Sequence, residues 1–212
     1  MRVIKFTHSC VRLEGDGGVL VIDPGTFSER AALDGVDAVL ITHEHADHLD
    51  VDALADALAK RPTVTVHTHP DVAPRLATLG DVVTTVESGQ SFQAAGLAVR
   101  AYGGWHAEIH PDIPRVVNLG FLVDDGDTSV YHPGDSFDLP AGAPVDTLFV
   151  PVSAPWLKAS ESVDFVRAVA PRRAYALHDG LLNDRGAALT DGVLSRLTGC
   201  EYGHVAAGTA LA

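Results

Sequence analysis

The sequence of 212 residues is poor in cysteine and contains only Cys10 and Cys200. Neither lies near a histidine-rich motif. Two widely separated cysteines in a chain without an export pattern are expected to be free thiols. Met1–Lys5 leads directly into an expected strand and lacks the basic, apolar and small-residue regions of a signal peptide. We therefore expect a cytoplasmic protein.

Long apolar runs are also missing, although hydrophobic residues make up 46% of the chain. This combination is typical of a globular protein with a substantial core and argues against a membrane span. The chain has no linker, repeat or low-complexity tract. We therefore expect one domain over residues 1–212.

Basic residues are few, since 15 lysines and arginines stand against 28 aspartates and glutamates, for a formal net charge of −13. Nucleic acids are bound mainly by basic surfaces. No nucleic-acid or membrane partner is therefore expected, and we predict a small-molecule substrate. The composition leaves a homo-oligomer open.

The most informative segment that is present is Thr42–His48, which places three imidazoles and a carboxylate within a few positions. Neutral imidazoles and ionised carboxylates are ligands for divalent cations, and their burial without a cation would be costly. Side chains two apart in an extended segment point the same way, so His43 and His45 can hold one ion. A helix is expected to begin at Asp47 and His48, so these side chains should point toward a second, neighbouring ion position. The segment therefore predicts two metal positions.

The flanking residues place this segment at the end of a strand. Val36–Ile41 is an apolar, branched run typical of a buried strand, and Leu49–Lys60 has apolar residues at helical spacing. In layered α/β proteins the carboxyl end of a strand is where ligands usually bind. A single His-x-His pair more often serves another role, but the full string favours metal binding.

The string His-x-His-x-Asp-His resembles the signature of the metallo-β-lactamase superfamily. The resemblance implies an α/β fold, a four-layer αββα sandwich of two mixed β-sheets with a dinuclear site at one edge. It also implies a further histidine, a bridging aspartate and a last histidine, each after a later strand.

His106 fits the first of these positions, because the alternating segment Leu97–Tyr102 runs through a glycine pair and Trp105 into this imidazole. His110 lies close by and is the alternative. It precedes Pro111 in a loop, where an exposed histidine is ordinary.

Asp135 and His178 fit the other two positions. Thr128–Ser136 is a β-branched strand that ends in a turn, and Asp135 resembles the carboxylate that bridges two ions. On its own, the Gly-Asp pair would be a simple turn. His178 follows the expected strand Arg173–Leu177. Asp179 is either an alternative ligand or a residue that hydrogen-bonds to a ligand and orients it.

The resemblance thus implies a complete set of ligands for two divalent ions. The first ion would be held by His43, His45 and His106, the second by Asp47, His48 and His178, with Asp135 and a hydroxide between them. Zn²⁺ is the expected metal, and Mn²⁺ or Fe²⁺ would suit the same ligands.

The expected reaction is hydrolysis of a small lactone, ester or phosphodiester by the metal-bridging hydroxide. Asp47 is a catalytic candidate because it can hold metal and orient the nucleophile. His132, with Tyr131 beside it, is the candidate donor to the leaving group. His132 has an equal alternative, a bond to Asp135 or to backbone. Asp23 resembles an early family aspartate that supports the ligands.

Several other segments are similar to a compact branch related to L-ascorbate-6-phosphate lactonase. They are Thr7–Cys10, Trp105–His106, His132–Asp135 and Pro151–Ser153. Ser153–Trp156 departs from this branch, which often has glycines there.

The roles of three side chains stay open. Trp156 and Lys158 either touch the substrate or are a packing residue and a solvated lysine, and the second reading is favoured. His8 either lines the pocket or caps the first turn.

Three other functions are less favoured than hydrolysis. A non-catalytic or regulatory metal-binding protein would use a closed site, usually rich in cysteine. Redox di-iron relatives generally carry an acidic residue where this chain has His45. An RNA-processing nuclease is least favoured, because such relatives use a basic, glycine-rich arm that is missing here.

The expected elements are the following. Strands are predicted near 2–7, 10–14, 18–23, 37–42, 63–67, 81–86, 97–103, 117–123, 128–132, 146–151 and 173–178, and helices near 49–60, 70–79, 160–170 and 186–198.

Overall fold

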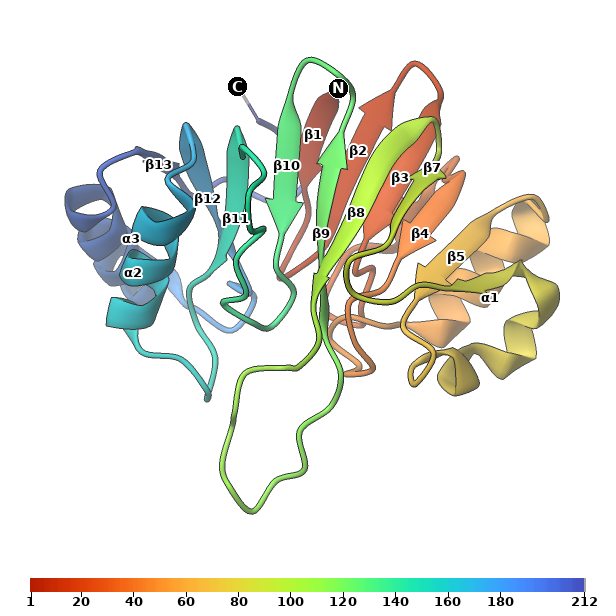
Figure 1. The fold of residues 1–212 in the computed structure, drawn as a ribbon, viewed down its shortest axis with the longest axis horizontal. Helices are drawn as coiled ribbons and strands as arrows, with labels where there is room; N and C mark the ends of the chain where they lie inside the picture. Colours follow the sequence, from red (N-terminus) through yellow and green to blue (C-terminus); the bar gives the residue numbers. More distant parts are fainter. Residues whose placement is uncertain (212) are drawn as a thin grey trace.

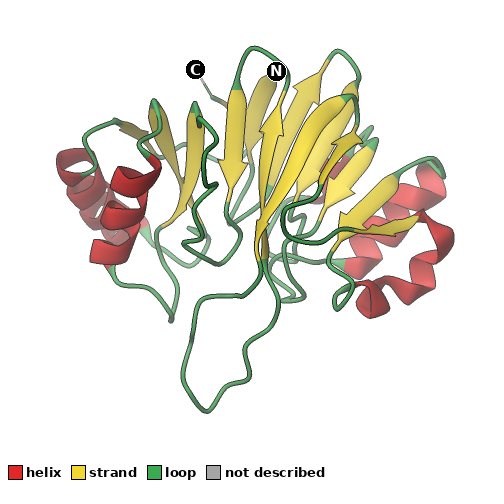
Figure 2. Cartoon of the chain, viewed as in Figure 1, coloured by secondary structure: helices red, strands yellow, loops and turns green. Residues whose placement is uncertain are grey.

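The computed structural model describes residues 1–211 and consists of two seven-stranded mixed sheets that pack face to face. Helices cover the outer face of each sheet, so that helices flank the strands on both sides of the molecule (Figures 1 and 2). The prediction of a four-layer αββα sandwich is therefore confirmed.

The first sheet has the strand order β14-β1-β2-β3-β4-β5-β6. Its strands are β1 (Arg2–Lys5), β2 (Val11–Gly15), β3 (Gly18–Ile22), β4 (Ala38–Leu40), β5 (Thr65–Thr68), β6 (Val83–Thr85) and β14 (Thr209–Ala210). Pairing is antiparallel from β14 to β3 and parallel from β3 to β6. In the register, Ile22 lies opposite Val11 on one side and Leu40 on the other.

The second sheet has the order β13-β12-β11-β10-β9-β8-β7. Its strands are β7 (Ser91–Ala94), β8 (Leu97–Gly103), β9 (Leu119–Asp124), β10 (Ser129–His132), β11 (Thr147–Pro151), β12 (Arg173–Leu177) and β13 (Glu201–Gly203). Pairing is antiparallel from β7 to β10 and parallel from β10 to β13.

The helices begin at residues that can cap them. α1 (Val51–Lys60) begins after Asp50, whose carboxylate accepts a hydrogen bond from the Ala53 N–H, and α3 (Asp184–Leu197) begins after Asn183 in the same way. α2 (Ala159–Val169) ends before a proline, which cannot continue a helix. The other helical segments are two 3₁₀ helices, η1 (Arg30–Leu33) and η2 (Ala73–Val82).

Three apolar layers hold the sandwich together. The central layer lies between the sheets and includes Leu13 and Leu20 from the first sheet and Phe121 and Phe149 from the second, all fully buried. A second layer lies between the first sheet and α1, and a third between the second sheet and α2 and α3. Burial of this apolar surface is the main stabilising contribution to such a fold.

All predicted strands are present, but three others were missed and one helix was wrong. β7, β13 and β14 are short strands at sheet edges, and β13 and β14 have only three and two residues. The helix expected at 70–79 is instead η2, which has non-helical φ and ψ at Gly80. Glycine carries no Cβ and therefore adopts this conformation readily.

The fold brings the carboxyl ends of four strands, β4 of the first sheet and β8, β10 and β12 of the second, to one edge of the sandwich. β8, β10 and β12 run in the same direction, because β9 is antiparallel to both β8 and β10 and β12 is parallel to β11. The long loop 104–118 between β8 and β9 extends from this edge (Figure 1).

No helix within residues 1–211 has the length and apolarity needed to cross a membrane.

Candidate metal centre

Two groups of side chains with the chemistry of metal ligands meet at this edge. In the first group, one nitrogen each from His43, His45 and His106 lies within 4.8 Å of the others. His43 and His45 follow β4, and the Nε2 atom of His43 lies 3.1 Å from Nδ1 of His45. His106 comes from the loop after β8. These are the three residues predicted to hold the first ion.

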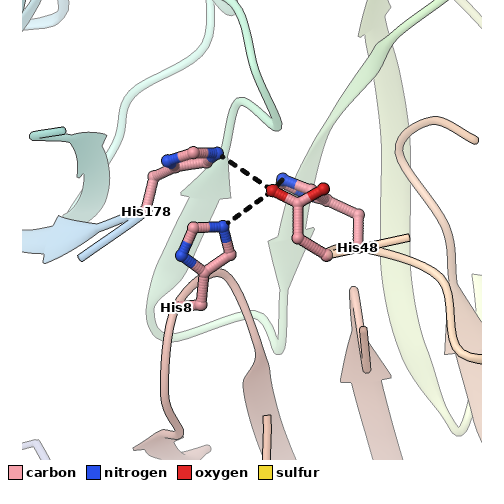
Figure 3. A group of neighbouring side chains, drawn as sticks. His8, His48 and His178 are labelled. Atoms are coloured by element: carbon pink, nitrogen blue, oxygen red, sulfur yellow. Dashed lines mark hydrogen bonds and ion pairs between the residues drawn. The ribbon is translucent and has the colours of Figure 1, made fainter. Parts of the chain in front are cut away.

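The second group contains Asp47, His48 and His178, as predicted, and also His8. Oδ2 of Asp47 lies 2.9 Å from Nε2 of His8 and 3.4 Å from Nε2 of His178. The rings of His8, His48 and His178 face a common point, although they come from three different segments of the chain (Figure 3).

Asp135 lies between the two groups. Its Oδ2 atom is 3.3 Å from Nε2 of His106 in the first group and 3.1 Å from Nε2 of His178 in the second. Its Oδ1 atom is 3.1 Å from Nε2 of His48. One carboxylate therefore faces both groups, as a bridging ligand must.

Several of these atoms are buried without a hydrogen-bond partner. They are Nε2 of His48, His106 and His178 and Oδ1 of Asp135. The short separations do not have the geometry of hydrogen bonds. A buried polar atom without a partner costs about 1–3 kcal/mol, and few native proteins leave several together. Cations placed in the two groups would satisfy these atoms, so the donor set fits divalent metal ions.

The other ring nitrogens are occupied, which leaves the facing nitrogens free for an ion. The Nδ1–H groups of His106 and His178 donate to the carbonyls of Ala107 and Ser153, both at 2.6 Å. Such partners behind the ligands fix the tautomer and the ring orientation.

Asp23 has the supporting role that the sequence suggested. Its carboxylate accepts the Nδ1–H of His48 at 2.7 Å and both the backbone N–H and the hydroxyl of Thr42. The Thr42 hydroxyl in turn lies 2.9 Å from Nδ1 of His43. Asp23 thus orients ligands of both groups and is itself fully buried.

The electrostatics of the site favour positive charge. Burial alone would raise the pKa of Asp47, but the nearby ring of His178 and the hydrogen bond from His8 hold it well below its ordinary value. The pKa of Asp135 is also well below its ordinary value, because the charge of His48 and the nearby rings of His106 and His178 outweigh burial. Burial lowers the pKa of His178, but the nearby carboxylates of Asp135 and Asp47 raise it to about 9.

In contrast to His178, three other histidines of the site have a lowered pKa. Burial lowers the pKa of His43 and of His45, and neighbouring imidazoles lower both further. The pKa of His8 is also lowered, chiefly by burial. These rings are therefore neutral at pH 7, and a neutral imidazole is the form that binds a metal ion.

Other candidates lie outside the cluster. His110 is exposed and interacts with Asp112, and Lys158 is exposed at the start of α2. Asp179 is bonded to Lys5 and His204 and does not face the ligand atoms.

Both ring nitrogens of His132 are bonded to backbone, since Nε2 donates to the Ser9 carbonyl and Nδ1 accepts from the Gly134 N–H. The Tyr131 hydroxyl donates to the Asp138 carbonyl. Of the two roles considered for His132, this geometry favours the structural one.

Two residues whose roles the sequence left open, the buried His8 and the half-buried Trp156, lie at the site. The Nε1–H of Trp156 donates to Oδ2 of Asp135 at 3.1 Å, and its ring lies against His106 and His178. The sequence signals were the position of His8 after the first strand and that of Trp156 in the loop between the bridging aspartate and the last histidine, although packing was the favoured role for Trp156.

Trp156→Phe is expected to weaken metal binding about tenfold, the lower end of what partners of metal ligands contribute. The variant keeps the aromatic packing and loses the hydrogen bond to Asp135. Competition with a chromophoric chelator measures the affinity. Trp105→Phe is the matched control, because this tryptophan is exposed on the neighbouring loop. Equal affinities in the two variants would contradict a role for the Nε1–H bond.

Residues 2–178 match the family model described as "Beta-lactamase superfamily domain". This match covers most of the chain, including every predicted ligand. The chain belongs to the metallo-β-lactamase superfamily. Over 205 residues it is 40% identical to protein Rv0786c of Mycobacterium tuberculosis, with 95% of each chain covered. It is also 32% identical over 148 residues to a UPF0173 metal-dependent hydrolase of Methanopyrus kandleri, covering 64% of this chain and 62% of that protein.

Solved structures support the same fold. Igni18, a metallo hydrolase from Ignicoccus hospitalis, aligns with a TM-score of 0.75 at 18% identity, covering 99% of this chain and 97% of that one. Together, the superfamily, the relatives and the ligand clusters confirm the prediction of a metal-dependent hydrolase.

Proposed function

We propose that this superfamily member is a dinuclear hydrolase that acts on a small lactone, ester or phosphodiester, with Zn²⁺ as the first choice of metal. The observation that carries the proposal is the position of Asp135. Its carboxylate faces His106 of one group and His178 of the other, at 3.3 and 3.1 Å. A single metal position would not need ligand atoms on both sides of a shared carboxylate.

Two cations held there would lower the pKa of a shared water and polarise the oxygen of the bond under attack. The side chains of the protein would orient the attacking water. Asp47 is ionised at neutral pH, so its carboxylate can hold a cation and accept a hydrogen bond from the attacking water. His132 is bonded to backbone on both nitrogens, so we assign it to support of the turn before Asp135.

The surroundings of the cluster favour a carbonyl substrate with an apolar portion. Ile109 and Ile113 lie beside His45 and His106 in the loop 104–118, and Ile113 is 46% exposed. On the other side, the half-exposed ring of Phe27 lies 5.1 Å from that of His8. Exposed apolar side chains at a site gain free energy when a substrate covers them.

The nearby arginines are already engaged. Arg115 donates two hydrogen bonds to the His106 carbonyl, and Arg75 is paired with Glu44 at 2.7 Å. A free arginine beside the metal ions would strengthen binding of an anionic phosphodiester, and none of these arginines is free. We therefore rank lactones and carboxylic esters above phosphodiesters, and the likeness to the lactonase-like branch agrees with this order.

Metal analysis followed by a substrate panel tests the proposal. Protein purified without chelators is expected to hold two divalent ions per chain. It should hydrolyse aryl esters and γ-lactones faster than bis(p-nitrophenyl) phosphate, with rates that increase from acetyl to longer acyl groups. Two bound ions without turnover on any class would favour the non-catalytic alternative. Faster cleavage of the phosphodiester would overturn the ranking of substrates.

A further inference from the structure

His8 has a strained backbone that the surrounding structure imposes. It lies in the turn between β1 and β2, is fully buried and has a φ of 66°, in the left-handed region. Residues other than glycine adopt this region at a cost and mostly where neighbouring contacts require it. Here the His8 N–H donates to Oδ1 of Asp179, and its carbonyl accepts from the N–H of His178. Both contacts come from the end of β12.

Strain of this kind gathers at the metal centre. Within residues 1–211, five residues other than glycine have positive φ, and His8, Asp23 and His178 are three of them. His178 is a predicted ligand, and Asp23 orients ligands of both groups. The strained backbone of His8 is therefore part of the same cluster of strained residues at the ligands, although His8 precedes the ligand motif by many residues.

The hydrogen bonds of the His8 ring determine its tautomer. The N–H of Gly180 donates to Nδ1 of His8 at 3.2 Å, so Nδ1 carries a lone pair and the ring proton lies on Nε2. Nε2 is 2.9 Å from Oδ2 of Asp47 and donates to it. A Cβ at residue 180 would lie 3.1 Å from the His8 side chain, so glycine allows this close approach.

We infer that His8 is a positioning residue that holds the Asp47 carboxylate at the second metal position and does not bind the ion itself. Oδ2 of Asp47, which accepts the hydrogen bond from His8, is also the oxygen that faces Nε2 of His178 at 3.4 Å. A carboxylate oxygen has two lone pairs and can accept an N–H while it binds a cation. The inference rests on the proposed two-ion centre and adds a residue to it.

The contacts behind His8 keep it in place. Asp179, which holds the His8 backbone, is bonded to the buried amine of Lys5 at 3.2 Å and to Nε2 of His204 at 3.1 Å. Lys5 is only 1% exposed, so this ion pair is largely shielded from water. Partners locked in this way position a ligand better than mobile ones do.

A pair of variants tests the inference. His8→Gln keeps an N–H donor at about the place of Nε2, whereas His8→Asn tolerates a positive φ but is too short to reach Asp47. Titration with Zn²⁺ against a chromophoric chelator should show binding of the second ion weakened about 10- to 100-fold in His8→Asn and only a few-fold in His8→Gln. Thermal melting of the metal-free proteins should be similar for the two variants. His67→Asn, a buried imidazole on β5, is the control and should bind Zn²⁺ as the wild type does.

The outcomes separate the inference from the proposed function. Wild-type affinity in His8→Asn would overturn the inference while leaving the two-ion centre intact. Complete loss of one ion in both variants would make His8 a ligand and would also overturn it. Fewer than two Zn²⁺ ions per wild-type chain would overturn the proposed centre, and the inference with it.

Discussion

Asp135→Asn is expected to abolish binding of the second ion and to reduce turnover by on the order of 10³-fold or more. The substitution keeps the size of the side chain and an oxygen that can accept the Trp156 N–H, but it removes the charge shared by His106 and His178. Lewis-acid and nucleophile activation by a metal contributes several kcal/mol, and about 1.4 kcal/mol corresponds to a factor of ten. Metal content and kcat/KM on an aryl ester measure the two effects.

Asp138→Asn is the matched control for this substitution. Asp138 lies three positions further along the same loop and contacts none of the predicted ligands; its backbone carbonyl accepts from the Tyr131 hydroxyl. This variant should keep two ions and normal turnover. Two tightly bound ions together with normal turnover in Asp135→Asn would refute the bridging assignment.

Removal of metal is the second perturbation with a large expected effect. A ligand present at about a thousand times its Kd stabilises the folded state by about 4 kcal/mol. For a chain of 150–250 residues each kcal/mol shifts Tm by roughly 2–4 °C, so chelation should lower Tm by roughly 10 °C. The physical reason is the set of buried ligand atoms that have no other partner. Calorimetry with and without a chelator measures the shift, and added Zn²⁺ should restore it.

The size of this shift should depend on pH. Without metal, the pKa of His178 is raised to about 9, so its stabilising contribution is complete below the ordinary histidine pKa and is lost as the pH rises through 9. Metal binding requires the neutral ring, so the ion must displace this proton at lower pH. The increase in Tm on adding Zn²⁺ should therefore be larger at pH 8.5 than at pH 6.5.

Asp135→Asn again provides the control, because the chelator should change its Tm less than that of the wild type. A Tm that does not respond to chelator or to Zn²⁺ in the wild-type protein would contradict the metal centre itself. A shift of equal size at both pH values would contradict the competition between the proton and the ion at His178.

Much of the ligand set could be predicted because it is encoded locally. His43, His45, Asp47 and His48 lie in one short segment after a strand whose buried, branched residues are easily recognised. His106 could be chosen over His110 because it follows directly from β8, whereas His110 lies further along an exposed loop. The structure brings every predicted ligand to one cluster.

The supporting residues could not be predicted in the same way. His8 reaches Asp47 because of a left-handed turn held by Asp179 and Gly180, far away in the sequence. Trp156 reaches Asp135 from a loop whose course depends on the packing of α2 against β11. The edge strands β13 and β14 were missed because pairing with neighbours, and not their own composition, makes them strands.

The sequence by itself therefore indicated the superfamily and the layered fold, through the resemblance that the His-x-His-x-Asp-His string carries. It also indicated the candidate metal ligands, because ligand chemistry and strand ends are properties of short segments. Apart from Asp23, whose supporting role the resemblance had suggested, only the tertiary structure decided which side chains contact those ligands from behind. In the folded chain His132 is hydrogen-bonded to backbone, His8 to Asp47 and Trp156 to Asp135. The reason is physical: the direction of a single hydrogen bond depends on backbone turns and contacts between distant segments, and these exist only once the two sheets have packed together.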